Sequence, residues 1–378
     1  MIQRCRILTA VSTVALLAVA VAAEERFAIR AAAHVDASGE LRQGALIVIE
    51  NGLIASVNAD VASIGDIRVD TFEGAVVSPG LIDVHAGLGA DGQLSERQSA
   101  IQPDVVAGDA FDRFHRQFRM ALRAGVTSVG LSPDDANLVG GRIAICKTSG
   151  SGGAPYVLGD GPMKLSLAAD VLRRDRKPTS RGGAIAMLRG AIGAARESKD
   201  GSPMAALASG GLSAFVTAPS GADVLSILRM ASDYGLKLTL IHQYDAHAIG
   251  DAIAAAKVGV IVGPYGFRDS RRSVGAAGIL EKRGITIAIA GGLPGASADS
   301  LRLGAAMAAR GGLSLAAARR AITSAPAEFL GVSDRIGSIA EGRDADLVIF
   351  SGDPLDLRSR VLAVYVDGRR VYTADSRE

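Results

Sequence analysis

Histidine is scarce in this sequence, with five copies in 378 residues, and two of them end apolar runs. His85 follows the run at residues 81–84, and His242 follows the run at residues 238–241. An imidazole can bind a divalent metal or transfer a proton near neutral pH. If both runs are strands of one barrel, their carboxyl ends meet at the same mouth. We therefore predict that the two imidazoles face one cavity.

The remaining histidines and one nearby acid have simpler interpretations. Asp245 and His247 fall at the start of a helix predicted at residues 246–257. There Asp245 is either the helix N-cap or a residue of the pocket, and His247 is a surface or core residue. His34 and His115 have no motif around them, and His115 lies in a predicted helix, which indicates a structural role.

The elements that must position these residues alternate between strand and helix from about residue 80 to about residue 331. The predicted strands cover residues 81–84, 127–131, 143–147, 214–217, 238–242, 259–262 and 285–290. The predicted helices include residues 109–124, 184–197, 222–234, 246–257, 298–310 and 314–323. Several of these strands are apolar on both faces, as buried parallel strands are. The pattern predicts a parallel α/β domain, either a closed barrel or an open sheet.

Both ends of the chain are predicted to be rich in β-strands. Asn51-Gly52 separates two apolar runs, which is the strongest short signal for a β-hairpin, and Asp367-Gly368 turns the apolar run at residues 361–366 into residues 369–372. Because the ends share this pattern and the middle does not, we predict that they form one β unit beside the α/β domain.

Two segments carry a family resemblance. The first is SPGLIDVH at residues 78–85, and the second runs from residue 336 to 348 and contains EGRDADLV. Together with TSAPAEFLG at residues 323–331, they resemble the amidohydrolase superfamily, and most closely its imidazolonepropionase-like and dipeptidase-like branch. The resemblance covers nearly all of the chain after the first 23 residues.

The resemblance implies a fold and a division of the chain. The fold is an α/β (β/α)8-type TIM barrel with a flanking composite β-sandwich formed by both termini. The implied parts are a signal peptide at 1–23, the composite domain at 24–78 plus 335–378, and the barrel at 79–334.

The resemblance also implies chemistry, which the residues only partly support. Family members usually hydrolyse carbon–nitrogen bonds with a metal-activated water. His85 and His242 match metal-ligand positions, and Lys147 is a weaker match to a carboxylated lysine. The second histidine of the usual His-x-His pair is replaced by Gly87, and a strand-end aspartate is missing as well. The matching positions for that aspartate are Gly291 and Gly292.

The sequence supplies too few metal ligands for the usual hydrolysis. A catalytic zinc site uses three protein ligands and a water. We therefore expect zinc or another divalent metal to bind weakly or not at all. The chain is then a binding module for a small ligand or a partner, with weak or absent hydrolysis. The alternative is an active hydrolase with an unusual mononuclear site on His85 and His242. Besides these imidazoles, the expected pocket residues are Asp245, Gly87, Gly291 and Gly292.

The N-terminus predicts where the protein is located, and the overall charge limits the kinds of partner that it can bind. Arg4 and Arg6, an apolar run at residues 7–21 and the small residues Ala22 and Ala23 match a signal peptide, so we expect a periplasmic or secreted protein. The alternative is an uncleaved anchor. Cleavage removes two of the 41 basic residues and leaves 39 against 39 acidic ones, which argues against a nucleic-acid partner.

Three further features complete the sequence picture. Cys146 is the one cysteine outside the predicted signal peptide, and its apolar surroundings indicate a buried structural thiol. The glycine-rich turns at residues 149–153 and 291–297 could present backbone N–H groups to an anion at the rim of a pocket.

Overall fold

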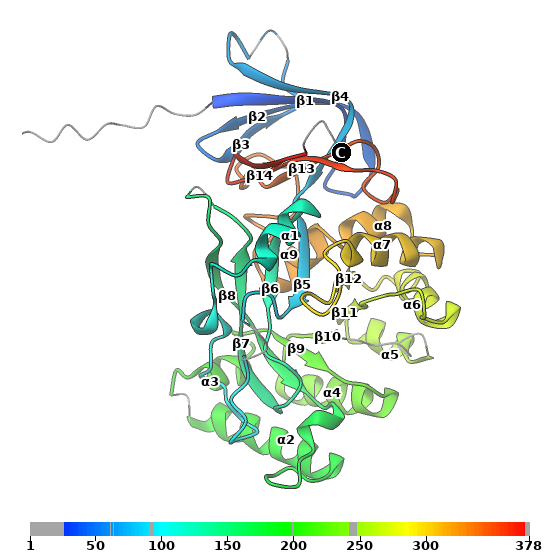
Figure 1. The fold of residues 1–378 in the computed structure, drawn as a ribbon. Helices are drawn as coiled ribbons and strands as arrows, with labels where there is room; N and C mark the ends of the chain where they lie inside the picture. The colour runs from blue at the N-terminus through cyan, green and yellow to red at the C-terminus, as the bar shows by residue number, and fades with distance from the viewer. Residues whose placement is uncertain are drawn as a thin grey trace, which may run out of the picture.

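The computed structural model of this chain describes residues 26–60, 62, 64–90, 94–150, 152–198, 200–241 and 248–374. The predicted signal peptide lies outside the described residues, and so do His242, Asp245 and His247. The described chain forms two sheets, and Figure 1 shows the one built from both termini at one end of the barrel.

The sheet from both termini has seven strands in the order β15-β14-β13-β4-β1-β2-β3. Its strands are β1 Arg26–Val35, β2 Leu41–Glu50, β3 Leu53–Val57, β4 Arg68–Pro79, β13 Leu347–Phe350, β14 Val361–Val366 and β15 Arg369–Thr373. β4 pairs with β13, so the two ends of the chain meet in the middle of the sheet. Asn51, Gly52, Asp367 and Gly368 all have positive φ, as two-residue hairpin turns require. The predicted second sheet from both termini is confirmed.

The second sheet has eight strands in the order β12-β11-β10-β9-β8-β7-β6-β5 and is nearly closed into a barrel. Its strands are β5 Leu81–Ala86, β6 Val126–Leu131, β7 Val139–Lys147, β8 Tyr156–Ser166, β9 Ala214–Thr217, β10 Leu238–Ile241, β11 Gly259–Val262 and β12 Ile287–Ile289. Apolar side chains fill it, among them Val84, Ile145, Phe215 and Ile261. The predicted barrel class is confirmed.

One strand departs from the parallel arrangement that alternation suggested. β7 runs antiparallel to both β6 and β8, while the other neighbouring pairs of this sheet are parallel. The carboxyl end of β7 therefore lies at the amino ends of its neighbours. Lys147, the last residue of β7, is consequently placed at the opposite end of the barrel from His85.

Most helices lie on the outside of the barrel (Figure 1), whereas α9 Ser324–Leu330 packs against the apolar side chains that fill it. The other helices are α1 Gln117–Arg123, α2 Arg181–Ser198, α3 Pro203–Ala208, α4 Gly221–Tyr234, α5 Gly250–Ala255, α6 Arg271–Glu281, α7 Ser300–Arg310 and α8 Leu315–Arg320, with short 3-10 turns at Ala107–Ala110 and Ala169–Val171. None of the helices in the described chain is both long enough and apolar enough to cross a bilayer.

One helix is shorter than the sequence predicted. The helix predicted at residues 109–124 begins only at Gln117, because the segment before it folds as successive tight turns. His115 therefore precedes the helix rather than lying within it, which corrects the sequence-based interpretation. Cys146 is fully buried as predicted, and burial raises the pKa of its thiol to about 12.

A buried carboxylate helps close the barrel between its first and last strands. Asp83 of β5 accepts hydrogen bonds from the backbone N–H groups of Gly291 at 2.9 Å and Leu293 at 3.4 Å, both just after β12. The side chain is fully buried, and burial raises the pKa of its carboxyl to about 6 despite these hydrogen bonds. Asp83 thus joins the two strands that a barrel must bring together.

Candidate functional site at the barrel mouth

The mouth of the barrel lies at the carboxyl ends of its parallel strands, and His85 lies there near the end of β5. His85 is half-buried, and its backbone N–H is 3.4 Å from Asp83 Oδ1. The loop that follows β6 brings Asp135 toward the same place. A positive charge on the His85 imidazole would help to lower the pKa of the Asp135 carboxyl, so the electrostatic influence of His85 reaches this carboxylate.

A buried lysine completes this cluster. Lys164 lies on β8 between Met163 and Leu165, which face the helices, and its side chain is fully buried. Its ammonium group donates to Asp135 in a short ion pair, to Thr217 Oγ1 at 2.9 Å and to the Leu165 carbonyl at 3.3 Å. An ammonium group has three N–H donors, and three acceptors surround this one. The charge is therefore fully satisfied inside the protein.

The carboxylate partner is strongly held in its charged form. Burial alone would raise the pKa of the Asp135 carboxyl. The Lys164 ammonium, the Thr217 hydroxyl and nearby His85 outweigh burial and keep this pKa well below its ordinary value. At neutral pH the mouth thus contains a fixed Lys164–Asp135 ion pair beside His85.

The sequence did not identify this cluster. β8 was missing from the predicted strands, because glycines and a proline interrupt its alternation, and Lys164 and Asp135 were not singled out. One signal was available: a lysine between apolar residues in the segment Met163–Leu165 is unusual on a buried strand and requires a partner.

The glycines that replace family ligand positions differ in how much space surrounds them. A Cβ at Gly87 would meet only the Pro294 ring, at 3.5 Å. A Cβ at Gly291 would lie 2.8 Å from Asp83 Oδ2, and Gly292 has φ of +76° with its Cβ direction blocked by Pro264. A side chain at 291 or 292 therefore requires the closure around Asp83 or Pro264 to shift, whereas one at 87 does not.

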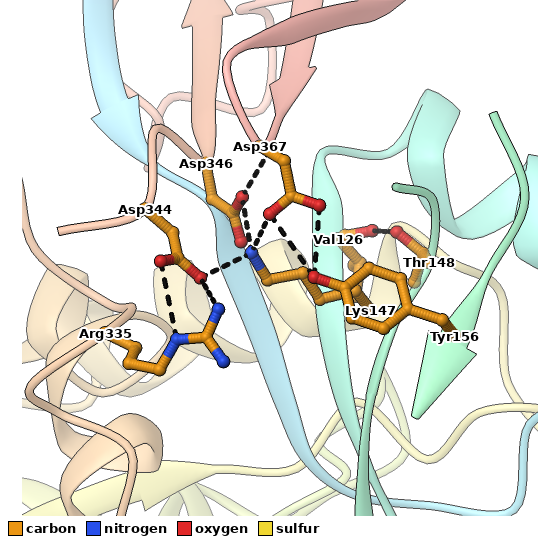
Figure 2. A network of polar contacts seen from close by, with 8 residues as sticks. All are labelled: Val126, Lys147, Thr148, Tyr156, Arg335, Asp344, Asp346 and Asp367. Atoms are coloured by element: carbon orange, nitrogen blue, oxygen red, sulfur yellow. Dashed lines mark hydrogen bonds and ion pairs between the residues drawn. The ribbon is translucent and has the colours of Figure 1, made fainter. Parts of the chain in front are cut away.

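The structure places Lys147 far from this mouth. Its buried ammonium binds Asp344 Oδ2 at 2.7 Å and Asp346 Oδ1 at 3.1 Å, and it forms a shorter contact with Asp367 (Figure 2). These carboxylates belong to the segment leading into β13 and to the β14–β15 turn. Burial alone would lower the pKa of Lys147, but the surrounding carboxylates raise it well above its ordinary value. Lys147 therefore joins the barrel to the composite sheet and is not brought together with His85.

The described residues of the mouth do not by themselves make up a complete set of metal ligands. In the described ranges, no three His, Cys, Asp or Glu side chains gather as a metal site requires. The described part of the mouth contains an ammonium group bound to the carboxylate of Asp135. His242, the other imidazole expected at the mouth, lies outside the described residues, so the shared cavity remains a prediction.

Comparisons with known proteins agree with this architecture. A family model described as "Amidohydrolase family" matches residues 264–372. The amidohydrolase tasK of Hapsidospora irregularis is 36% identical over 90 residues, which span 24% of this chain and only 9% of that relative. An amidohydrolase from Thermotoga maritima MSB8 has a TM-score of 0.83 at 26% identity, covering 92% of this chain and 100% of that one.

A more distant structure shares the fold alone. An adenosine deaminase from Xanthomonas campestris with bound zinc has a TM-score of 0.52 at 18% identity, covering 91% of this chain and 92% of the other. The chain is therefore similar to amidohydrolases in two respects: residues 264–372 match the family model, and the fold resembles the Thermotoga maritima amidohydrolase over 92% of the chain.

Proposed function

We propose that the barrel mouth binds a small molecule with an amide-type carbon–nitrogen bond, and that metal-dependent hydrolysis there is weak or absent. The observation that carries this proposal is the buried Lys164–Asp135 ion pair beside His85. The family relationship supports the ligand class, and the ion pair supports the loss of metal chemistry.

The physical argument concerns charge and ligands. A divalent cation placed beside His85 would be repelled by the Lys164 ammonium. It could gain Asp135 as a ligand only by taking this carboxylate from Lys164. An ammonium left buried without its partner costs about 3–5 kcal/mol, which directly weakens metal binding. The same fixed charges can instead orient a polar ligand through hydrogen bonds.

The first test measures metal and ligand binding on the purified full chain. We expect elemental analysis to find substoichiometric zinc in protein prepared without added metal. Dipeptides, hydantoins and lactams are then screened for a rise in melting temperature, with hydrolysis followed in the same samples. The proposal predicts that at least one class stabilises the protein, that EDTA does not abolish this effect, and that hydrolysis stays near background.

The alternative is an active hydrolase with a mononuclear site on His85 and His242. One or more equivalents of tightly held metal, lost together with hydrolysis in His85→Ala, would establish it and refute the proposal. Lys164→Arg is the matched control, because it keeps a cation beside Asp135 and so should leave the low metal content unchanged.

Export is a separate part of the proposal. The positive residues Arg4 and Arg6, the apolar run that follows and the small residues before Glu24 support cleavage after Ala22 or Ala23. N-terminal sequencing of protein recovered from the cell envelope or medium tests it. A cytoplasmic chain that still begins at Met1 would contradict it.

A further inference from the structure

A cavity lies at the opposite end of the barrel from the candidate site. Its volume is about 720 Å³, and it lies where the segment around α1 and the loop after β7 meet β4 and β15 of the composite sheet. Thr148, in that loop, donates its hydroxyl to the Val126 carbonyl at 2.8 Å, which fixes the wall to the amino end of β6. The cavity is therefore distinct from the mouth that contains His85.

The lining of this cavity carries charge of one sign. Its arginines are Arg68, Arg113, Arg116, Arg119, Arg369 and Arg370. Half-buried His115 also lines it, and no Asp or Glu is among its described lining residues. The whole chain has a net charge of only +2, so this concentration of guanidinium groups is local. Like charges brought together at one concave site repel one another unless an anion binds between them.

Three of these arginines come from one short stretch of backbone. The N–H of Arg119 donates to the Arg116 carbonyl three residues back, and side chains three residues apart lie close together in such turns. Arg113 lies in the preceding turn, which the N–H of His115 closes by donating to the Asp112 carbonyl. Arg113, Arg116 and Arg119 all line the cavity, and we call them the arginine row.

These three arginines are exposed, and among the described residues none of them forms an ion pair with a carboxylate. Arg68 is engaged differently, since it lies 3.3 Å from Asp70 and over the Phe27 ring. The arginine row thus provides the cationic groups with the greatest capacity to bind a ligand.

The opposite wall comes from the loop after β7 and consists of Thr148, Ser149, Gly150, Gly153, Ala154 and Pro155. A side chain at Gly150 would require the Tyr156 ring to move, because a Cβ there would lie 2.6 Å from it. The other described lining residues of this loop are small or apolar and bring no acidic group. An anion can therefore approach this wall closely without meeting negative charge.

We propose that this arginine pocket binds a small anion with two or more phosphate-type groups. A guanidinium group pairs with phosphate oxygens through two parallel hydrogen bonds, and arginine is the preferred residue for such recognition. The volume falls within the range of about 300–1,000 Å³ that small-ligand sites occupy. Convergence of arginines from β4, the α1 segment and β15 favours a compact multivalent anion over a flat lipid surface.

Isothermal titration of the full chain with inorganic pyrophosphate and tripolyphosphate tests this proposal. We expect one saturable site whose affinity falls as sodium chloride is added. The Arg116→Gln/Arg119→Gln double variant should bind at least about tenfold more weakly, since charge-assisted hydrogen bonds are lost. Arg123→Gln is the matched control, because Arg123 is exposed on the same helix but does not line the cavity, and it should change the affinity less than about twofold.

Three results would overturn the proposal. One is the absence of saturable heat with either polyphosphate. Another is an equal loss in Arg123→Gln, which would indicate unspecific attraction to a basic surface. The third is preferential binding to phosphatidylglycerol vesicles that Phe114→Ala abolishes, because Phe114 is 86% exposed beside the row and would serve a membrane rather than a small anion. Melting curves of each variant confirm that the fold is retained.

Discussion

Two fully buried lysines lie at opposite ends of this barrel, and they differ in the number of carboxylates that surround them. Lys164, at the mouth, has one carboxylate partner, Asp135, whose side chain is 25% exposed. Lys147, at the base, lies among three carboxylates, of which Asp344 and Asp346 are nearly inaccessible. The first lysine links a strand to a loop of the same barrel, whereas the second links the barrel to the composite sheet.

The number of carboxylates around each buried lysine corresponds to the parts of the chain that it joins. At the base, Lys147 neutralises carboxylates supplied by a distant part of the chain, and Arg335 assists by binding Asp344 at 2.8 Å (Figure 2). At the mouth, Lys164 and Asp135 form a neutral pair with no surplus charge. The base therefore depends on its lysine for stability, and the mouth uses its lysine to set the polarity of the site.

The largest expected effect follows from removing the lysine at the base. Lys147→Met leaves the buried carboxylate of Asp346 without its cation and Asp344 with Arg335 alone, and we expect a loss of about 3–5 kcal/mol in the free energy of unfolding. Urea unfolding followed by circular dichroism measures it. A loss below about 1 kcal/mol would show that the junction between the two sheets does not depend on this lysine.

The next effect is a pH dependence of opposite sign at the two ends. Burial raises the pKa of the Asp346 carboxyl to about 6 although Lys147 opposes the shift, and Asp367 adds to it. The folded state therefore holds this proton more tightly than the unfolded state, whose pKa is about 3.8. Protonated Asp346 stabilises the folded state by up to about 3 kcal/mol below about pH 4, and this contribution is lost as the pH rises to about 6. Asp346→Asn lacks this loss, so it should gain stability relative to the wild type over that interval.

Asp135 provides the contrast, because its folded pKa is lowered. Its contribution is present above about pH 4 and disappears as pH falls below the unfolded value. Asp135→Asn should therefore be less stable than the wild type by a constant amount from about pH 5 to pH 8. Urea unfolding at a series of pH values checks both variants, and parallel curves for Asp346→Asn and the wild type would contradict the assignment at the base.

A smaller effect on stability is expected at the mouth. Lys164→Met leaves Asp135 partly exposed and able to bind water, so the free energy of unfolding should fall by only about 1–2 kcal/mol. The same substitution removes the cation beside His85 and frees a carboxylate, and zinc uptake should rise. Unfolding and elemental analysis are compared with Arg335→Gln, which should not change zinc uptake because Lys147 still binds the carboxylates at the other end. If the zinc content of Lys164→Met is the same as that of the wild type, this ion pair does not control metal binding.

The two ends were also unequally predictable from sequence. The hairpins at Asn51-Gly52 and Asp367-Gly368 depend on local turn chemistry, and the sequence predicted them correctly. Apolar runs such as residues 214–217 and 259–262 gave strands with unchanged limits. The reversed direction of β7 could not be predicted, because strand direction depends on connections in space rather than on residue pattern.

The candidate site was only partly predictable for the same reason. His85 was identified from a local motif and lies at the mouth as expected. Lys164 and Asp135 lie 29 positions apart and meet only through the fold. Lys147 was considered as a ligand because it ends a strand, but β7 is antiparallel, so that end lies at the base. Proximity across a barrel requires knowing the direction of every strand.

The smallest expected effect concerns Arg335, which can be compared with Lys147 at the same end of the barrel. Arg335 and Lys147 both bind Asp344, but the Arg335 side chain is 45% exposed and the Lys147 side chain is fully buried. An exposed ion pair contributes about 0–1 kcal/mol, because water solvates both charges and salt screens them. Arg335→Gln should therefore lower the free energy of unfolding by less than about 1 kcal/mol, and the loss should shrink further in high salt. Lys147→Met removes a buried cation from three carboxylates, whereas Arg335→Gln removes a half-exposed cation from Asp344 alone, so both burial and the number of partners predict the larger loss for Lys147→Met. Equal losses in the two variants would mean that neither burial nor the number of carboxylate partners determines how strongly this junction is held.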